Sequence, residues 1–275
     1  MKIYLTITLM TLAGMMTGCR HKPTGTVSAA VTDSIPDEVR QVVLAVENSD
    51  TAKFASRVSY PLARPYPLHN IENAEQMKEY YSTLVDDSLR HVISSQSKDW
   101  SEYGWRGWSV RDGEFLWIDS LIYDIPYVSA REQVNLDSLR HKDILTLQPS
   151  LRDGWEPVAA YRGDNGEIVR IDAKNGKQPT DNDALRMLLY ANGMQLTGQP
   201  TKTAHGMLDQ EGSALNTAYR FTDTKGGVWI LETEPTDSSR PMIYYEAPDG
   251  DAREMPITPV YWLDIVGHDS GKTHQ

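Results

Sequence analysis

The spacing of the apolar residues changes at Trp100, and this change constrains the fold more than any other feature of the sequence. Before Trp100, apolar side chains recur every three or four residues, which is typical of helices with one buried face. After it, they alternate with polar residues or form short runs between turn residues, which is typical of β-strands. Helices followed by strands predict an α+β protein with antiparallel sheets, because a parallel sheet would require the two kinds of element to alternate.

Three helices are expected before Trp100. The first begins at residues 34–38, where a serine, a proline and two acids form a favourable first turn. The second covers residues 51–58. The third follows Asn73, whose side chain suits an N-cap, and continues towards Ile93. Between the second and third helices, prolines exclude a helix from residues 60–67.

A β-hairpin is expected directly after the helices. Its strands are residues 105–110 and 115–118, and Asp112 and Gly113 supply the positive φ angles of the turn. Residues 121–125 are expected to continue the sheet.

The second half of the chain is expected to consist of strands and turns. Seven strands are predicted: Trp155–Tyr161, Glu167–Ala173, Leu185–Tyr190, Tyr219–Thr222, Val228–Glu232, Met242–Glu246 and Tyr261–Val266. Glycine-containing turns separate several of them, at 163–166, 174–176, 225–227 and 248–250. Short strands at this spacing predict an all-β barrel or sandwich.

These patterns divide the chain into successive parts. Residues 35–127 form an α+β domain, residues 155–267 an all-β module, and residues 268–275 a C-terminal tail. Residues 128–154 are a linker or covering segment, in which Leu136, Leu139 and Leu147 fit either a helix or a loop.

Part of the first half resembles envelope proteins of the cystatin-like α+β cone, also called the nuclear transport factor two-like or ketosteroid-isomerase-like fold. The shared pattern is a Tyr-Pro-Leu segment, an Asn-capped helix and a hairpin rich in Gly and Trp. Its residues here are Tyr60, Pro61, Leu62, Asn73, Gly104, Trp105, Gly107, Asp112, Gly113, Glu114 and Trp117. The resemblance implies helices packed on a curved antiparallel sheet. It implies no activity, because this fold carries enzymes, binders and adaptors alike.

The N-terminus carries a second resemblance. Lys2 and the apolar stretch 3–16 have the charge and length of a signal peptide, and Met16-Thr17-Gly18 leads to Cys19. This junction resembles the lipobox of bacterial lipoproteins, with Met16 in place of the usual Leu. The resemblance implies that residues 1–18 are removed, that Cys19 is lipidated, and that residues 19–34 tether the protein to a membrane. Cys19 is the only cysteine in the chain, so it has no internal disulfide partner.

The net charge and the predicted signal peptide together limit the kinds of binding partner that we expect. The formal charge of −11 becomes −12 once residues 1–18 are removed, because Lys2 is their only charged residue. An acidic protein does not attract nucleic acid non-specifically. No acid stands between Cys19 and Asp33. In lipoproteins, retention and surface-export signals tend to involve acids at these positions, so we expect a periplasm-facing protein of the cell envelope.

No catalytic constellation is evident in the sequence. The seven histidines do not fall at metal-ligand spacing, and there is no Gly-x-Ser-x-Gly nucleophile motif. We therefore expect no catalytic residue, metal or cofactor. An isomerase-like or hydrolase-like enzyme using a pocket in the cone remains the alternative. The polar groups that could reach such a pocket are Asp119, Asp124, Tyr80, Tyr81 and Tyr123.

The preferred hypothesis is binding, and it depends on tryptophans. Trp100, Trp105, Trp108 and Trp117 crowd the hairpin region. On a regular strand Trp105 and Trp108 would point to opposite faces, so one of them is expected to face away from the core. An exposed tryptophan suits stacking on a small ligand or anchoring a protein partner, whereas a buried one would only pack.

Overall fold

The computed structural model describes residues 35–94, 99–175, 185–191, 194–198, 201–208, 214–222, 225–232 and 241–269. The predicted signal peptide, Cys19 and the tether lie outside these residues. The chain divides into two compact units, Met1–Asp137 and Ser138–Gln275.

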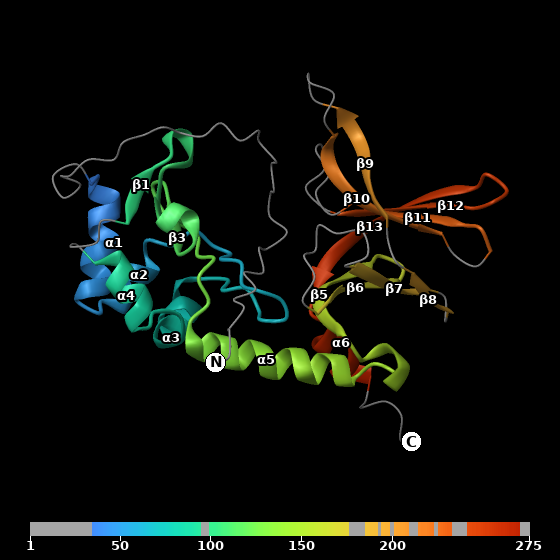
Figure 1. Ribbon diagram of the computed structural model, residues 1–275, viewed down its shortest axis with the longest axis horizontal. Helices are drawn as coiled ribbons and strands as arrows, with labels where there is room; N and C mark the ends of the chain where they lie inside the picture. The colour runs from blue at the N-terminus through green and yellow to red at the C-terminus, as the bar shows by residue number, and fades with distance from the viewer. Residues whose placement is uncertain are drawn as a thin grey trace. The chain divides into compact units, whose positions relative to one another are not determined.

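The first unit begins with four helices (Figure 1). They are α1 (Asp37–Glu47), α2 (Thr51–Ala55), α3 (Ala74–Leu84) and α4 (Asp87–Ile93). The predicted cap is confirmed, because the Asn73 side chain accepts a hydrogen bond from the Gln76 N–H. The helix expected to run on to Ile93 is instead two helices. The Asp86 side chain accepts from the Leu89 N–H and starts α4 anew.

A four-stranded antiparallel sheet follows, in the order β1-β2-β3-β4. Its strands are β1 (Trp100–Glu102), β2 (Trp108–Val110), β3 (Leu116–Ile118) and β4 (Ile122–Asp124). The Asp112-Gly113 turn is confirmed, with φ angles of 54° and 88°. The predicted strand 105–110 is wrong in its first half, which is the 3₁₀ turn η1 (Gly104–Arg106). Gly104 and Gly107 bend the chain there at φ angles of 59° and 78°, which a regular strand does not contain.

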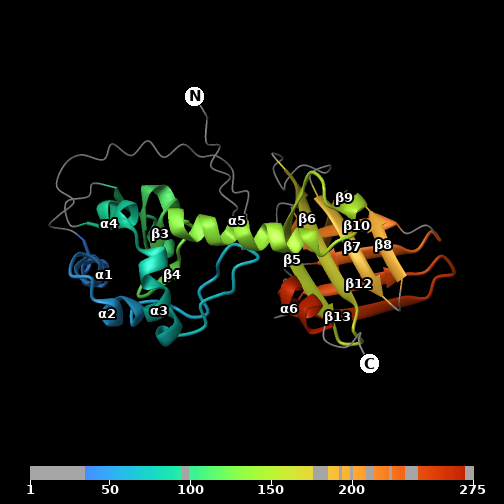
Figure 2. The same ribbon diagram turned by 90° about the horizontal axis from the view of Figure 1, so that it is seen from below.

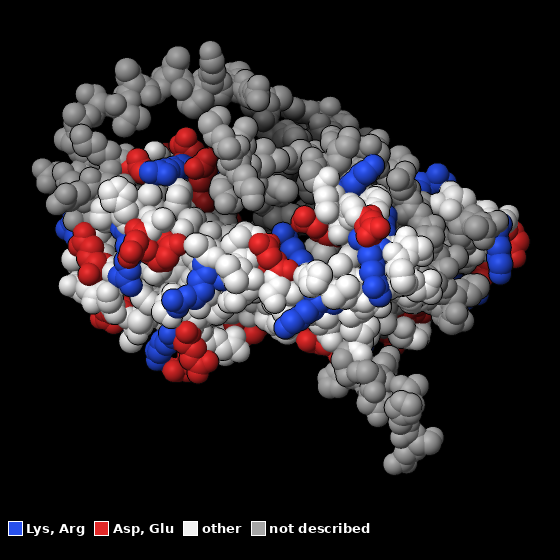
Figure 3. All heavy atoms as spheres, turned by 60° about the horizontal axis from the view of Figure 1, so that its bottom comes forward, with Lys and Arg blue, Asp and Glu red and all other residues white. Residues whose placement is uncertain are grey.

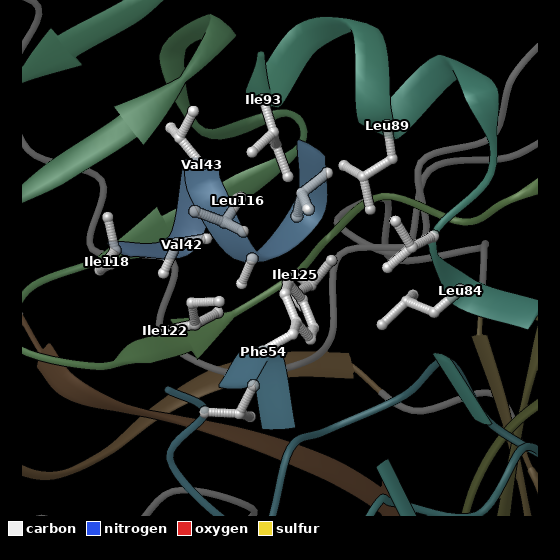
Figure 4. Packing of buried hydrophobic residues seen from close by; sticks show 14 of the residues in the cluster. Val42, Val43, Phe54, Leu84, Leu89, Ile93, Leu116, Ile118, Ile122 and Ile125 are labelled. Atoms are coloured by element: carbon white, nitrogen blue, oxygen red, sulfur yellow. The ribbon is translucent and has the colours of Figure 1, made fainter. Parts of the chain in front are cut away.

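The helices and one face of this sheet enclose the first core. Figure 4 shows side chains from α1, α2, α3 and α4 converging on residues of β3 and β4. The fully buried members include Val42, Phe54, Leu84, Leu116 and Ile122. Val39, Val42, Val43 and Val46 recur at helical spacing along α1, and all four are buried. Apolar burial at this density is the main stabilising contribution to the unit.

The segment left open between helix and loop is a helix, α5 (Ala130–Leu145). The division between the two units falls inside it. Its buried positions are Glu132, Leu136 and Asp143, which are spaced four and seven residues apart and so share one face. Two of these three buried residues are charged, so the sequence of α5 shows no amphipathic pattern of apolar residues. The short 3₁₀ helix η3 (Pro149–Leu151) follows.

The described strands of the second unit form one antiparallel sheet that curls into an open half-barrel (Figure 2). Its order is β8-β7-β6-β5-β13-β12-β11-β10-β9. The strands are β5 (Trp155–Gly163), β6 (Ile168–Lys174), β7 (Leu185–Ala191), β8 (Met194–Gly198), β9 (Thr201–Leu208), β10 (Ala214–Thr222), β11 (Val228–Glu232), β12 (Met242–Glu246) and β13 (Ala252–Val260). The expected sandwich is therefore wrong for these strands, since they do not divide into two packed sheets.

Two further predictions for this unit are corrected. The strand expected at 261–266 is the helix α6 (Trp262–Asp269), so the unit is not all-β, and the tail expected from residue 268 begins later. Trp262 and Ile265 are both buried, which matches helical spacing better than alternation. The strand β13 was not expected, because Pro256 and Pro259 argue against a strand interior.

Both faces of the sheet around β6 and β7 are buried. Val169, Ile171 and Met187 join one apolar cluster on one face. Arg170 and Asp172 alternate with them and point to the opposite face, where they are also fully buried. The molecule is thus a mixed α+β protein with antiparallel sheets, as predicted at the level of fold class.

Candidate binding surface

The sheet of the first unit has a core face and an outer face. Trp117 lies between Leu116 and Ile118, both of which are fully buried. Because side chains alternate along a strand, the Trp117 indole lies on the outer face. Aromatic residues gather around it, and we call them the aromatic patch: Tyr103, Trp105, Trp117 and Tyr123.

Ring contacts hold three members of the patch together. The Trp117 ring centroid lies 5.2 Å from that of Tyr103, with an edge-on angle of 63°, and 6.4 Å from that of Tyr123. Gly113 makes this packing possible, because a β-carbon at that position would collide with the Trp117 indole. The hairpin turn therefore needs glycine for its positive φ and for the space beneath the indole.

Trp105 is the most exposed large apolar side chain among the described residues, at 84% of its full exposure. The η1 turn that carries it is fixed by backbone hydrogen bonds, from Gly107 N to Gly104 O at 3.0 Å and from Tyr103 N to Gly107 O at 2.8 Å. The Tyr123 hydroxyl also donates to Arg106 O at 3.0 Å. Trp105 is thus the member of the patch that projects from this hydrogen-bonded turn, and little ordering cost remains for a contact made there.

A guanidinium already stacks on the exposed indole. The Arg106 Cζ lies 5.0 Å from the centroid of the Trp105 ring, within the range of a cation–π contact. The second basic side chain of the hairpin, Arg111, pairs with Asp99 at 2.8 Å and lies over Phe115. Both basic side chains of the hairpin region therefore contact neighbouring residues of the first unit.

Carboxylates border the patch at both ends. The Tyr103 hydroxyl donates to Asp112. Burial and this hydrogen bond raise the pKa of Tyr103. Burial and the charge of Asp124 raise the pKa of Tyr123, whereas the charge of Arg106 lowers it. The pKa of Asp124 is itself raised by its burial. The patch therefore combines flat aromatic surface with nearby carboxylates and the charge of Arg106.

The two tryptophans predicted as binding residues have different environments. Trp105 is exposed, whereas Trp108 is half-buried and packs against the first core. One of them faces away from the core, as expected, but the cause is the η1 turn and not strand alternation. Tyr103 and Tyr123 were not singled out as binding residues. Their proximity to Trp117 depends on strand pairing, and the sequence pattern does not give that register.

A buried polar cluster in the first unit involves Tyr80, and the charge of its Arg64 also acts on Asp124. Arg64 and Glu132 form a two-point ion pair, with Nε–Oε1 at 2.7 Å and Nη2–Oε2 at 2.5 Å. The Tyr80 hydroxyl donates to Oε1 at 3.0 Å. Both carboxylate oxygens of Glu132 are thus occupied, and this geometry suits a structural pair.

The second unit buries a larger charged cluster. Arg170 pairs with Asp143 of α5 and, at 2.7 Å, with Asp172. Arg186 pairs with the other oxygen of Asp172, also at 2.7 Å. Trp262 of α6 lies over Arg170, with Cζ 5.2 Å from its ring centroid. The indole N–H of Trp262 donates to Thr146 Oγ1 at 2.6 Å. Helix α6 therefore closes this cluster from the side opposite the sheet.

Charge elsewhere forms no single-sign field on the visible face. Figure 3 shows acidic and basic side chains interspersed over the described surface. Within the described residues, no three His, Cys, Asp or Glu side chains gather as a metal site would require. A search of the same residues for a helix of membrane-spanning length and apolarity finds none.

Comparison with known proteins adds no assignment. No family model matches the chain, and neither curated proteins nor solved structures give a match.

Proposed function

We propose that this protein is a lipoprotein of the cell envelope, anchored through Cys19 and facing the periplasm, which binds a small ligand or a protein partner without catalysis. The exposure of Trp105 carries the binding part of this proposal. An indole in water on an ordered turn lacks the burial that normally stabilises such a residue. At interfaces, tryptophan is among the residues that contribute most to affinity.

The neighbourhood of Trp105 supports the same function. Trp117 and Tyr123 extend the flat surface, and Leu121, two residues before Tyr123, is 37% exposed. Exposed aromatic and apolar groups gathered on one sheet face are typical of interaction sites. We further propose that the first unit is a cystatin-like cone, since helices followed by an antiparallel sheet is the element order of that fold.

The enzyme alternative has one observation in its favour, the carboxylate of Glu132 beside the Tyr80 hydroxyl. A general base needs an oxygen that can accept a substrate proton. Arg64 occupies both oxygens of Glu132, at 2.7 and 2.5 Å, so the pair supports catalysis less than the patch supports binding.

The binding proposal is tested by photo-crosslinking in membranes, with the crosslinker placed at the exposed Leu121, two residues before Tyr123. Trp105→Ala should remove the crosslinked species, whereas Val134→Ala should keep them. Val134 is a matched control because its apolar side chain is 68% exposed on α5. Thermal melts confirm that each variant is folded. Equal crosslinking by both variants would exclude Trp105 as the anchor.

The anchor is tested separately by fatty-acid labelling. Cys19→Ala should abolish labelling and leave a full-length precursor, because the thiol is the acceptor of the lipid. Labelling that survives the substitution contradicts the lipoprotein assignment without affecting the binding proposal.

A further inference from the structure

We propose that the occupant of the aromatic patch is a basic segment of another protein, with an arginine or lysine side chain placed against Trp105. This inference rests on the proposed binding function and gives it a partner chemistry. It follows from charge complementarity between the patch and its border.

The border of the patch is strongly acidic. Residues 99–124 contain six acids and two bases, a net charge of −4. Asp112 accepts a hydrogen bond from Tyr103, and Asp124 is the register partner of Trp117 across β3 and β4. Asp119 adds a further negative charge near Tyr123. Carboxylates around aromatic faces favour a cation over an anion or a neutral sugar.

The molecule already contains the contact that the partner would make. The Arg106 guanidinium stacks on Trp105 at 5.0 Å, in a geometry that a partner arginine can reproduce. Arg106 is itself exposed, so an incoming cation can displace it or use the other side of the indole. In either case Arg106 competes with a basic partner and would help an acidic one.

The decisive measurement is therefore whether removing the Arg106 charge strengthens or weakens the binding of a basic peptide. The probe is a fluorescent peptide of alternating arginine and glycine, titrated by anisotropy against the detergent-solubilised full-length chain. Arg106→Gln should raise the affinity for this peptide about two- to fourfold, because it removes a like charge a few ångströms away. The backbone oxygen that Tyr123 uses is retained in this variant.

Three further variants distinguish binding at the patch from a general effect of the protein's negative charge. Trp105→Ala should lower the affinity by at least about tenfold, as expected for an aromatic anchor. Asp119→Asn should weaken binding about two- to fourfold. Glu38→Gln removes an exposed acid on α1, remote in sequence from the patch, and should change affinity less than twofold.

Several outcomes would overturn the inference. They are a weaker affinity for the basic peptide in Arg106→Gln, equal effects of Asp119→Asn and Glu38→Gln, and tighter binding of a glutamate–glycine peptide or a chito-oligosaccharide. If Trp105→Ala abolishes crosslinking in membranes but the basic peptide does not compete, the binding function stands and the basic partner is wrong. If Trp105→Ala has no effect in either assay, both fail.

Discussion

The two units each contain an arginine stacked on a tryptophan, and the two pairs differ mainly in exposure. Arg170 lies 5.2 Å from the ring centroid of Trp262, and Arg106 lies 5.0 Å from that of Trp105. Trp262 is 5% exposed, whereas Trp105 is 84% exposed. Nearly the same contact therefore closes a charged cluster in the second unit and stands open to solvent in the first. Burial, and not the contact itself, distinguishes the structural pair from the pair on the proposed binding surface.

The sharpest test of this comparison removes each arginine. Arg170→Met should lower the free energy of unfolding by about 3–5 kcal/mol, because it takes the cation from the buried carboxylates of Asp143 and Asp172. Arg106→Met, at the exposed pair, should stay within about 0.5 kcal/mol. Denaturant unfolding of both variants measures the difference, and losses of similar size would mean that the two pairs are energetically alike.

A smaller difference is expected from the tryptophans themselves. Trp262→Phe loses the indole N–H that donates to Thr146 at 2.6 Å and should cost about 1–3 kcal/mol. Trp105→Phe should be nearly neutral, since the described contacts of Trp105 are confined to the surface. Thermal melts of the two variants provide the check, and a larger shift for Trp105→Phe would contradict the assignment of the exposed pair.

A pH effect is expected in the first unit. Burial, assisted by hydrogen bonding to Asp86, raises the pKa of Tyr127 to about 12. The unfolded chain then releases this proton near its usual pKa of about 10, before the folded chain does. Stability is therefore fully present below pH about 10 and falls as the pH rises towards about 12.

Tyr127→Phe should accordingly flatten the alkaline part of the stability profile. The variant loses its hydrogen bonds to Asp86, so its stability at neutral pH serves as the reference. Denaturant midpoints at neutral pH and near pH 11 test the prediction. An unchanged slope between them would assign the alkaline loss to other tyrosines, such as Tyr60.

The smallest expected stability effect accompanies the largest expected binding effect. Trp105→Ala should change the free energy of unfolding by no more than about 0.5 kcal/mol, because its side chain is 84% exposed. Calorimetry on the purified protein checks this value. A loss of several kcal/mol would show that Trp105 supports the fold. The binding proposal would then be tested by Arg106→Gln instead of Trp105→Ala.

Local sequence signals predicted the local structure well. Asn73 caps α3 as its residue type suggests, and Asp112 and Gly113 adopt the positive φ angles that the hairpin requires. The strands β11 and β12 have the predicted bounds. In each case, chemistry within a few residues determines the conformation, so a single sequence is enough.

Features that depend on distant residues were missed. Arg64 and Glu132 are 68 residues apart, and no local pattern links them. The buried face of α5 is largely charged, so its helical period is not apolar. Residues 261–266 were predicted as a strand but lie mostly in the helix α6, because a short apolar run fits either kind of element. Of the aromatic patch, only Trp105 was predicted as a binding residue, because the other predicted residue, Trp108, packs against the first core.

The buried acids of α5 belong to different units. Glu132 pairs with Arg64 of the first unit, and Asp143 pairs with Arg170 of the second. Each carboxylate therefore has its arginine within its own unit. A residue inserted at the division after Asp137 should leave both ion pairs intact, because neither pair crosses that point. An insertion between Ser129 and Glu132 would instead rotate the Glu132 carboxylate about 100° around the helix axis, away from Arg64. The length of α5 is thus constrained where its buried acids meet their own units.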